Sequence, residues 1–287
     1  MLITVFTPTY NRVHLLPRLY ESLRAQTFHD FEWIIVDDGS TDDTEEVVKS
    51  FFPPLGGIKG GLIRQPNGGK HRAINRGVQE ARGELFFIAD SDDYLPDDSL
   101  AKVAERYQKI KGDKRIGGVC GLDIAPDGTC VSSKLPQDEI ICNSLDIRLK
   151  YHVTGDLKEV FFTSVMREFP FPEFEGERFC PEALVWDRIA QQYNLLFFNE
   201  PIYIAEYQPG GITAGIVRAR MNSPMASVTT YQELNSYNLP FKEKIKAAIN
   251  YWRFRACVAK GKQVPKLPWY WFWCRPLGFA MHLKDKQ

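Results

Sequence analysis

A short apolar run that ends abruptly in acids is the feature that most constrains this chain. Residues 85–89 read Leu-Phe-Phe-Ile-Ala, and they are followed at once by Asp90, Ser91, Asp92 and Asp93. Such a run is typical of a strand buried on both faces of a parallel sheet. In an open α/β sheet, ligands bind just beyond the carboxyl ends of the strands. The sequence therefore predicts a binding edge whose hard oxygen ligands suit Mg²⁺ or Mn²⁺, or alternatively a plain acidic turn before a helix.

The residues before this run repeat a pattern of strand, polar loop and helix. Strands are predicted at 3–6, 31–36 and 61–64, and the apolar spacing predicts helices over 16–23, 41–51 and 70–81. Ser40 and Asp43 resemble a capping box at the start of the second helix. Three such units before residue 85 predict four strands in one mostly parallel sheet with right-handed crossovers.

The pattern changes after residue 98. We expect a hairpin over 116–130, strands at 160–166 and 195–198, and a helix over 181–193. The predicted organisation is a domain over 1–215 and a helical, basic and aromatic extension over 216–287. The pattern of residues 1–98 is typical of a nucleotide-binding α/β half. If the domain is catalytic, as the resemblance described below implies, 99–215 is expected to be its acceptor half, completed by a glycine-rich stretch at 210–213.

The composition excludes several classes of protein. The chain has 36 basic and 36 acidic residues, and this balance argues against a duplex nucleic-acid binder. Six cysteines lie far apart with no CxxC pair, so we expect reduced thiols in a cytoplasmic protein. The first residues predict a strand rather than a signal peptide, and no apolar run is long enough for a membrane span.

Four segments carry chemistry-bearing residues in a fixed order. They are TPTYNR at 7–12, VDDGSTDDT at 36–44, NGGKHRAINRG at 67–77 and ADSDD at 89–93. In this spacing the sequence resembles the inverting glycosyltransferases of family 2. The resemblance covers the N-terminal third well and the middle of the chain in outline. It implies the GT-A fold of nucleotide-diphospho-sugar transferases and a UDP-sugar donor.

The resemblance implies a nucleotide site at the strand ends. Its expected substrate-binding residues are Thr7, Pro8, Tyr10, Arg12, Asp37, Asp38, Gly69, Lys70, His71, Asp90 and Ser91. A carboxylate such as Asp38 can anchor the base or the ribose, although the same residue could instead form an Asx turn. The turn at 68–71 is not a Walker A loop, yet it offers backbone N–H groups and cations at a helix N-terminus. Those cations could equally be solvated first-turn residues.

The resemblance also implies a metal and a general base. Asp92 is the expected ligand of Mn²⁺ or Mg²⁺, with Asp93 as a second candidate, and the metal would neutralise the leaving UDP. Counting back from a helical Trp186 puts Glu182 at the position of the base, although Pro181 departs from the family pattern. Asp187 is the alternative base. Glu182 could instead be an acid that favours the helix dipole.

The C-terminal residues carry a separate signal. Basic side chains surround an apolar helical face over 242–260, and PWYWFW at 268–273 precedes Arg275 and Lys284. A basic amphipathic helix with tryptophans suits a membrane surface, so we expect peripheral contact with the inner face of a membrane and a lipid-linked acceptor. The alternative is that the aromatic residues pack on the catalytic domain.

The sequence therefore predicts an inverting glycosyltransferase that moves a sugar from a nucleotide-sugar to a glycan or lipid-linked acceptor during surface polysaccharide synthesis. A sugar-1-phosphate nucleotidyltransferase is the alternative enzyme, but it would need a glycine-rich basic loop where this chain has TPTYNR. A non-catalytic nucleotide or glycan binder is the alternative from another class. Glu182 distinguishes it from an enzyme.

Overall fold

The structure is a computed structural model that describes residues 1–52, 57–206 and 215–286. The chain divides into two compact units. Unit 1 comprises Met1–Gly68, Arg72–Pro170 and Arg188–Gln208, and unit 2 comprises Gly69–His71, Phe171–Asp187 and Pro209–Gln287. The glycine-rich stretch predicted at 210–213 lies outside the described residues.

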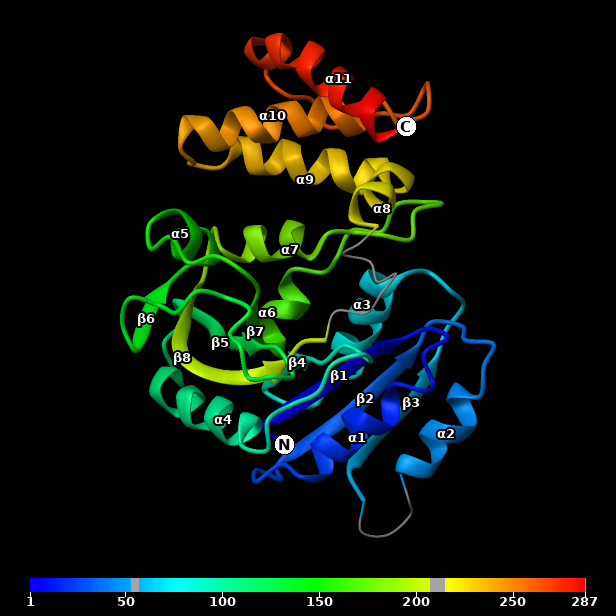
Figure 1. Ribbon diagram of the computed structural model, residues 1–287, viewed down its shortest axis with the longest axis vertical. Coiled ribbons are helices and arrows are strands. Elements are labelled where there is room, and N and C mark those ends of the chain that lie inside the picture. The colour runs from blue at the N-terminus through cyan, green and yellow to red at the C-terminus, as the bar shows by residue number, and fades with distance from the viewer. Residues whose placement is uncertain (53–56, 207–214, 287) are drawn as a thin grey trace. The chain divides into compact units, whose positions relative to one another are not determined.

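Unit 1 is built on one eight-stranded sheet with the order β3-β2-β1-β4-β7-β5-β8-β6 (Figure 1). The strands are β1 (Ile3–Thr9), β2 (Phe31–Asp37), β3 (Lys59–Arg64), β4 (Leu85–Ile88), β5 (Ile116–Ile124), β6 (Glu139–Cys142), β7 (Leu157–Phe162) and β8 (Asn194–Ile204). The first four strands run parallel, β7 is antiparallel to β4 and to β5, and β5 and β8 are parallel. The predicted mostly parallel α/β sheet is confirmed.

Helices cover both faces of the parallel strands. The helices of this part of the chain are α1 (Leu16–Arg24), α2 (Thr44–Phe51), α3 (Lys70–Glu80), α4 (Ser99–Ile110), α5 (Ser144–Leu149) and α6 (Thr163–Glu168). α1, α2 and α4 place Leu19, Val48 and Val103 in one core cluster with Val5 and Phe87 of the sheet. α3 packs on the other face, where Gly77 meets the ring of Phe6. β1, β2 and β4 are buried along their whole length, as helices on both faces of the sheet require.

Unit 2 is helical. It contains the start of α7 (Glu182–Ile189), followed by α8 (Ile216–Asn222), α9 (Pro224–Ser236), α10 (Phe241–Arg255), the 3₁₀ helix η1 (Trp269–Cys274) and α11 (Arg275–Asp285). α10 lies between α9 and α11 (Figure 1). Glu177 helps to hold this unit together because its carboxylate accepts the N–H groups of Met225 and Ala226, at 2.6 and 2.9 Å, at the start of α9.

Several predicted elements are wrong in extent or type. The helix expected over 181–193 is only α7, and the strand expected at 160–166 divides into β7 and α6. The second strand of the hairpin expected over 116–130 is reduced to one isolated antiparallel bridge, between Ile124 and Cys130. The predicted capping box is also wrong, because α2 begins only at Thr44 and Ser40 Oγ instead accepts the Asn11 N–H at 2.8 Å.

Because α3 packs closely on β1, we expect Gly77→Ala to destabilise the protein, although helix propensity alone would predict the opposite. A Cβ added to Gly77 would lie 2.2 Å from two ring carbons of Phe6, which is fully buried. Alanine favours a helix over glycine by about 1 kcal/mol, whereas overpacking a core costs about 1–3 kcal/mol. We expect Gly77→Ala to lower the free energy of unfolding measured in urea.

Gly61→Ala in β3 is the matched control, since nothing lies within 4 Å of a Cβ added there. A stabilised Gly77→Ala protein would contradict the packing of α3 on Phe6.

Candidate active site

The carboxyl ends of three strands bring the predicted nucleotide-binding segments together in unit 1. β1 pairs in parallel with β2 on one side and with β4 on the other. Beyond the ladders, the Asp38 N–H donates to the Thr9 carbonyl at 2.9 Å, and the Ala89 N–H donates to the Phe6 carbonyl at 2.7 Å. The loops that follow β1, β2 and β4 therefore start side by side.

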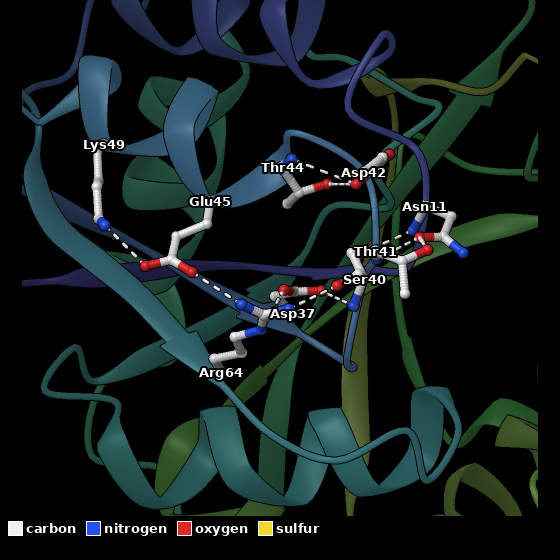
Figure 2. Close-up of polar contacts among 9 residues, drawn as sticks. All are labelled: Asn11, Asp37, Ser40, Thr41, Asp42, Thr44, Glu45, Lys49 and Arg64. Atoms are coloured by element: carbon white, nitrogen blue, oxygen red, sulfur yellow. Dashed lines mark hydrogen bonds and ion pairs between the residues drawn. The ribbon is translucent and has the colours of Figure 1, made fainter.

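The loop after β1 is tied to the loop after β2 by side chains (Figure 2). Asn11 has a left-handed φ of 51°, its N–H donates to Ser40 Oγ at 2.8 Å, and its Oδ1 accepts the Thr41 N–H at 2.8 Å. Tyr10, by contrast, is 47% exposed. The loop is thus held by its polar residues and leaves an aromatic ring at the surface, where a nucleotide base could stack.

Asp37 forms the turn that the sequence suggested for Asp38. It is fully buried, its Oδ1 accepts the Ser40 N–H at 2.8 Å, and its Oδ2 lies 3.4 Å from Arg64 Nε. Figure 2 shows that Arg64 also reaches the Ser40 carbonyl and Glu45, at 2.6 and 2.8 Å. These contacts indicate that Asp37 shapes the loop.

Asp38 connects this loop to the turn before α3. It is buried, and its Oδ1 accepts the Gly68 N–H at 2.9 Å and Gln65 Nε2–H at 2.8 Å. Gly39 next to it has a φ of 83°, and a Cβ there would lie 2.9 Å from the Asn67 nitrogen. This crowding requires glycine in the DDG segment.

The acidic turn after β4 is surrounded by cations. Arg12 Nη1 lies 2.7 Å from Asp92 Oδ2, and Arg18 Nη2 donates to the Asp92 carbonyl at 2.6 Å. Arg18 also pairs with Glu206 and lies over the ring of Tyr94. Positive charge from the loop after β1 and from α1 thus compensates the carboxylates of this turn.

Asp93 is held by the end of β8. The Tyr203 hydroxyl donates to Asp93 Oδ2 at 2.8 Å and accepts the Asp90 N–H at 2.8 Å, while the Glu206 N–H donates to Asp93 Oδ1 at 2.8 Å. Burial, and then the charge of Asp90, raise the pKa of Asp93 to about 6. Lys158 Nζ lies 3.5 Å from the centre of the Tyr203 ring and adds a cation–π contact. Two oxygens engaged in this way suit a residue that shapes the turn better than one that binds a metal.

The donor set can be tested against a divalent cation. Within the described part of the chain, no three Asp, Glu, His or Cys side chains converge closely enough to hold a metal by themselves. Mg²⁺ typically binds one or two carboxylates and completes its shell with water and substrate phosphates. Asp92 is half-buried and already faces a cation, the Arg12 guanidinium. The residues therefore fit a metal that arrives with a diphosphate.

The remaining predicted residues belong to unit 2. Glu182 is the first residue of α7, and its Oε1 lies 2.7 Å from Lys70 Nζ. His71 is buried. Gly69 has a φ of 97°, and a Cβ there would lie 1.9 Å from the Arg178 carbonyl oxygen. The structure thus brings one predicted phosphate-turn cation and the predicted base together as an ion pair.

Asp187 is half-buried in α7. Burial, and then the charge of Glu233, raise its pKa to about 7. A carboxyl group with a pKa near neutrality is suited to general acid–base chemistry, so Asp187 remains a candidate.

The sequence did not predict the residues that hold the acidic turn at 90–93 from distant parts of the chain. Tyr203 and Glu206 lie more than a hundred positions after that turn, and Arg18 lies on an otherwise amphipathic helix. No local motif marks such contacts. Thr7 was predicted as a ligand residue, but it is buried and its hydroxyl accepts the Trp33 indole N–H at 2.9 Å, which suits a supporting role.

The family model for "Glycosyl transferase family 2" matches residues 4–119, which contain all the strand-end loops described above. The glycosyltransferase GlyG of Streptococcus pneumoniae is 27% identical over 74% of this chain and 72% of its own length. Residues 4–119 of the chain therefore match glycosyl transferase family 2. The chain is accordingly an enzyme of the glycosyltransferase class, as the sequence predicted.

Other curated relatives match a smaller part. The chondroitin synthase of Pasteurella multocida is 31% identical over 46% of this chain and 13% of its own length. A PGL/p-HBAD biosynthesis glycosyltransferase of Mycobacterium bovis is 38% identical over 35% of this chain and 40% of its own length. The chain thus spans less than half the length of these two relatives.

Solved structures share the fold. A crystal structure of S. aureus TarS 1–349 has a TM-score of 0.63 and 20% identity, covering 91% of this chain and 73% of that one. The mannosyltransferase PcManGT of Pyrobaculum calidifontis has a TM-score of 0.58 and 18% identity, covering 99% and 88%. The expected GT-A fold is confirmed.

The contacts of Tyr203 generate a prediction. Tyr203→Phe removes the one hydroxyl that joins the Asp90 N–H to the Asp93 carboxylate, and leaves both without it in a largely buried position. Leaving such groups unsatisfied costs about 1–3 kcal/mol. We expect a loss of that size in the free energy of unfolding in urea.

Tyr193→Phe is the matched control, because its hydroxyl donates to Glu168 at an exposed position. If both variants lost the same stability, the hydroxyl of Tyr203 would not be holding the turn.

Proposed function

We propose that this chain transfers a sugar, with inversion, from a UDP-sugar to a hydroxyl of a glycan or lipid-linked acceptor in surface polysaccharide synthesis. The observation that carries this proposal is that Asp38 and the Asp90–Asp92 turn follow β2 and β4, on either side of the end of β1. A buried carboxylate there would recognise the nucleoside, and the acidic turn would receive its diphosphate with a cation.

The donor class is supported by the solved relatives. TarS 1–349 has been crystallised in complex with UDP-GlcNAc and with UDP, whereas PcManGT is in complex with GDP-Man and Mn²⁺. The uridine donor is favoured here because it accompanies the relative with the higher TM-score. In this proposal Pro8, Tyr10 and Asp38 contact the uridine, and Asp90 and Ser91 contact the ribose side.

The same proposal assigns the charged groups around the diphosphate. Asp92 would hold Mn²⁺ or Mg²⁺, which when bound supplies positive charge to the leaving UDP. Arg12 would turn from Asp92 towards a phosphate when the donor arrives, because the guanidinium matches either anion. Lys70 and His71, at the start of α3, would bind the pyrophosphate. Asp93 and Asp37 act by shaping their loops.

The acceptor chemistry needs one proton transfer. The acceptor oxygen bonds to the anomeric carbon as the bond from that carbon to the phosphate oxygen breaks. The hydroxyl proton passes to a general base, for which we propose Glu182, and the electron pair leaves with UDP. Asp187 is the alternative base in this proposal.

We also propose that the catalytic domain covers residues 1–215 and that residues 216–287 form a C-terminal extension.

A lipid-linked acceptor would require the enzyme to work at a membrane surface. In the described chain, no helix combines the length and the apolar character needed to cross a membrane. We propose a cytoplasmic enzyme that reaches a lipid-linked acceptor by peripheral contact of its C-terminal segment with the membrane.

The metal assignment predicts that UDP affinity depends on Asp92. Two phosphates and several carboxylates repel one another unless a cation intervenes. In titration calorimetry with UDP, we expect Mn²⁺ to strengthen binding to the wild type by about tenfold or more, which corresponds to about 1.4 kcal/mol. Asp92→Asn should abolish that gain.

Asp97→Asn is the control, because it removes a carboxylate of the same type from an exposed position nearby. An equal UDP affinity for wild type in Mn²⁺ and in EDTA would remove the metal from the proposal.

The base assignment predicts a loss of turnover without a loss of donor binding. Glu182→Gln should reduce kcat about a hundredfold or more and leave UDP affinity within about twofold, because a general base acts on the acceptor hydroxyl. The assay is release of UDP from a screened panel of nucleotide-sugars with candidate acceptors. Glu175→Gln, at an exposed position of the same unit, controls for the lost charge.

Asp187→Asn separates the two candidate bases. If Asp187 were the base, this variant rather than Glu182→Gln would lose turnover. The wild-type kcat/KM would then fall as the pH drops through about 7, where that carboxyl becomes protonated.

A further inference from the structure

The C-terminal helices η1 and α11 are apolar on two opposite sides. Their inner side packs within unit 2, where Trp271 and Cys274 join Ala248 of α10 in a core cluster. Gly278 continues this side, since a Cβ there would lie 2.6 Å from the Ile249 carbonyl oxygen. A helix that is apolar all round is normally buried on all sides.

The opposite side is not buried by any described part of the chain. We call it the outer aromatic face, and it comprises Trp269, Tyr270, Phe272, Trp273, Leu277, Phe279, Met281 and Leu283. Trp269 is 87% exposed, and the other seven side chains are 38–56% exposed. Single exposed apolar residues are ordinary, but eight of them between residues 269 and 283 indicate an interaction site.

The charge of the surrounding segment indicates the kind of partner. Residues 244–284 contain nine Lys or Arg residues and no Asp or Glu, although the whole chain has 36 of each sign. Lys266, Arg275 and Lys284 flank the outer aromatic face and are exposed. This combination of cations with Trp and Tyr matches the headgroup layer of an anionic membrane, where aromatic rings and basic side chains both find favourable contacts.

We propose that the outer aromatic face docks on the surface of an anionic lipid bilayer, with η1 and α11 lying in the plane of the interface. This inference deepens the proposed function, because it names the surface from which a lipid-linked acceptor would be taken. The apolar rings enter the boundary between headgroups and acyl chains, and the flanking cations contact the lipid phosphates.

The inner side explains how the face keeps its orientation. Arg253 of α10 makes two bonds to Asp285, with Nε to Oδ2 at 2.5 Å and Nη2 to Oδ1 at 2.7 Å, at the end of α11. The Trp252 indole N–H donates to the Trp271 carbonyl at 3.2 Å. The rings therefore project from a helix pair that is fixed before any membrane is met, and docking requires little ordering of the chain.

The test is sedimentation of the full chain with vesicles. We expect binding to vesicles of phosphatidylcholine with phosphatidylglycerol, weaker binding to phosphatidylcholine alone, and loss of binding as salt is raised. A triple variant, Trp269→Ser, Phe272→Ser and Trp273→Ser, should bind the anionic vesicles at least about tenfold more weakly. Its UDP affinity should equal that of the wild type. Its unfolding midpoint should fall only modestly, because the rings of Phe272 and Trp273 are about half exposed and also contact Trp252 and Trp271.

Ile141→Ser is the matched control, because this residue of β6 is 55% exposed and lies outside the outer aromatic face. Equal weakening by Ile141→Ser, or no vesicle binding by the wild type, would overturn the proposal. So would a stable dimer of the wild type that the triple variant abolishes, since a second copy would then be the occupant.

Failure of the docking proposal can be distinguished from failure of the proposed sugar transfer. Vesicle binding without any affinity for UDP would contradict the proposed function and leave the docking face intact. UDP binding without vesicle binding would contradict the docking face and the peripheral membrane contact, and it would leave the proposed sugar transfer intact.

Discussion

Parallel pairing of β1 with β2 and with β4 is the constraint on which the candidate site depends. The ladders run from Ile3 opposite Phe31 to Thr9 opposite Asp37, and from Ile3 opposite Leu85 to Phe6 opposite Ile88. Because parallel strands end at the same edge, this pairing sets two acidic loops on either side of a third. The carboxylates can share that edge because arginines from the neighbouring segments compensate their charge.

The parts of this arrangement that follow from local pattern could be predicted from the sequence. The four parallel strands and their helices were correct because each is a strongly patterned segment with a polar terminus. The loops proposed to bind the nucleotide were recognisable because each carries a motif and the motifs follow in a fixed order. Asp38 is one example, since the glycine after it marks a turn whose φ of 83° the structure confirms.

The parts that depend on contacts far apart in the sequence could not be predicted. The division of 157–168 into β7 and α6 is set by pairing with β4 and β5, because the residues themselves are apolar enough for either element. The hydroxyl of Tyr203 reaches Asp93 across 110 positions, and a tyrosine inside a strand carries no sign of that task. Asp37 and Asp38 are identical in type, so only the structure shows which one makes the turn.

The aromatic C-terminal segment shows a different limit. Its sequence allowed both packing and membrane contact, and the structure buries some residues of these helices and exposes others. Trp271 is buried, whereas its neighbours Phe272 and Trp273 are exposed. Residues 274, 278 and 282 are buried and lie four positions apart, so they form the inner side of α11, and the large apolar residues between them are exposed.

The central claim is that the Asp90–Asp92 turn receives a metal-bound UDP beside Asp38. Anomalous diffraction from a crystal soaked with UDP and Mn²⁺ tests it most directly. The account predicts a manganese peak about 2.1 Å from an Asp92 oxygen and from the diphosphate, with the uracil or ribose against Asp38. A UDP whose diphosphate contacts only arginine or lysine side chains, with manganese elsewhere or absent, would contradict it.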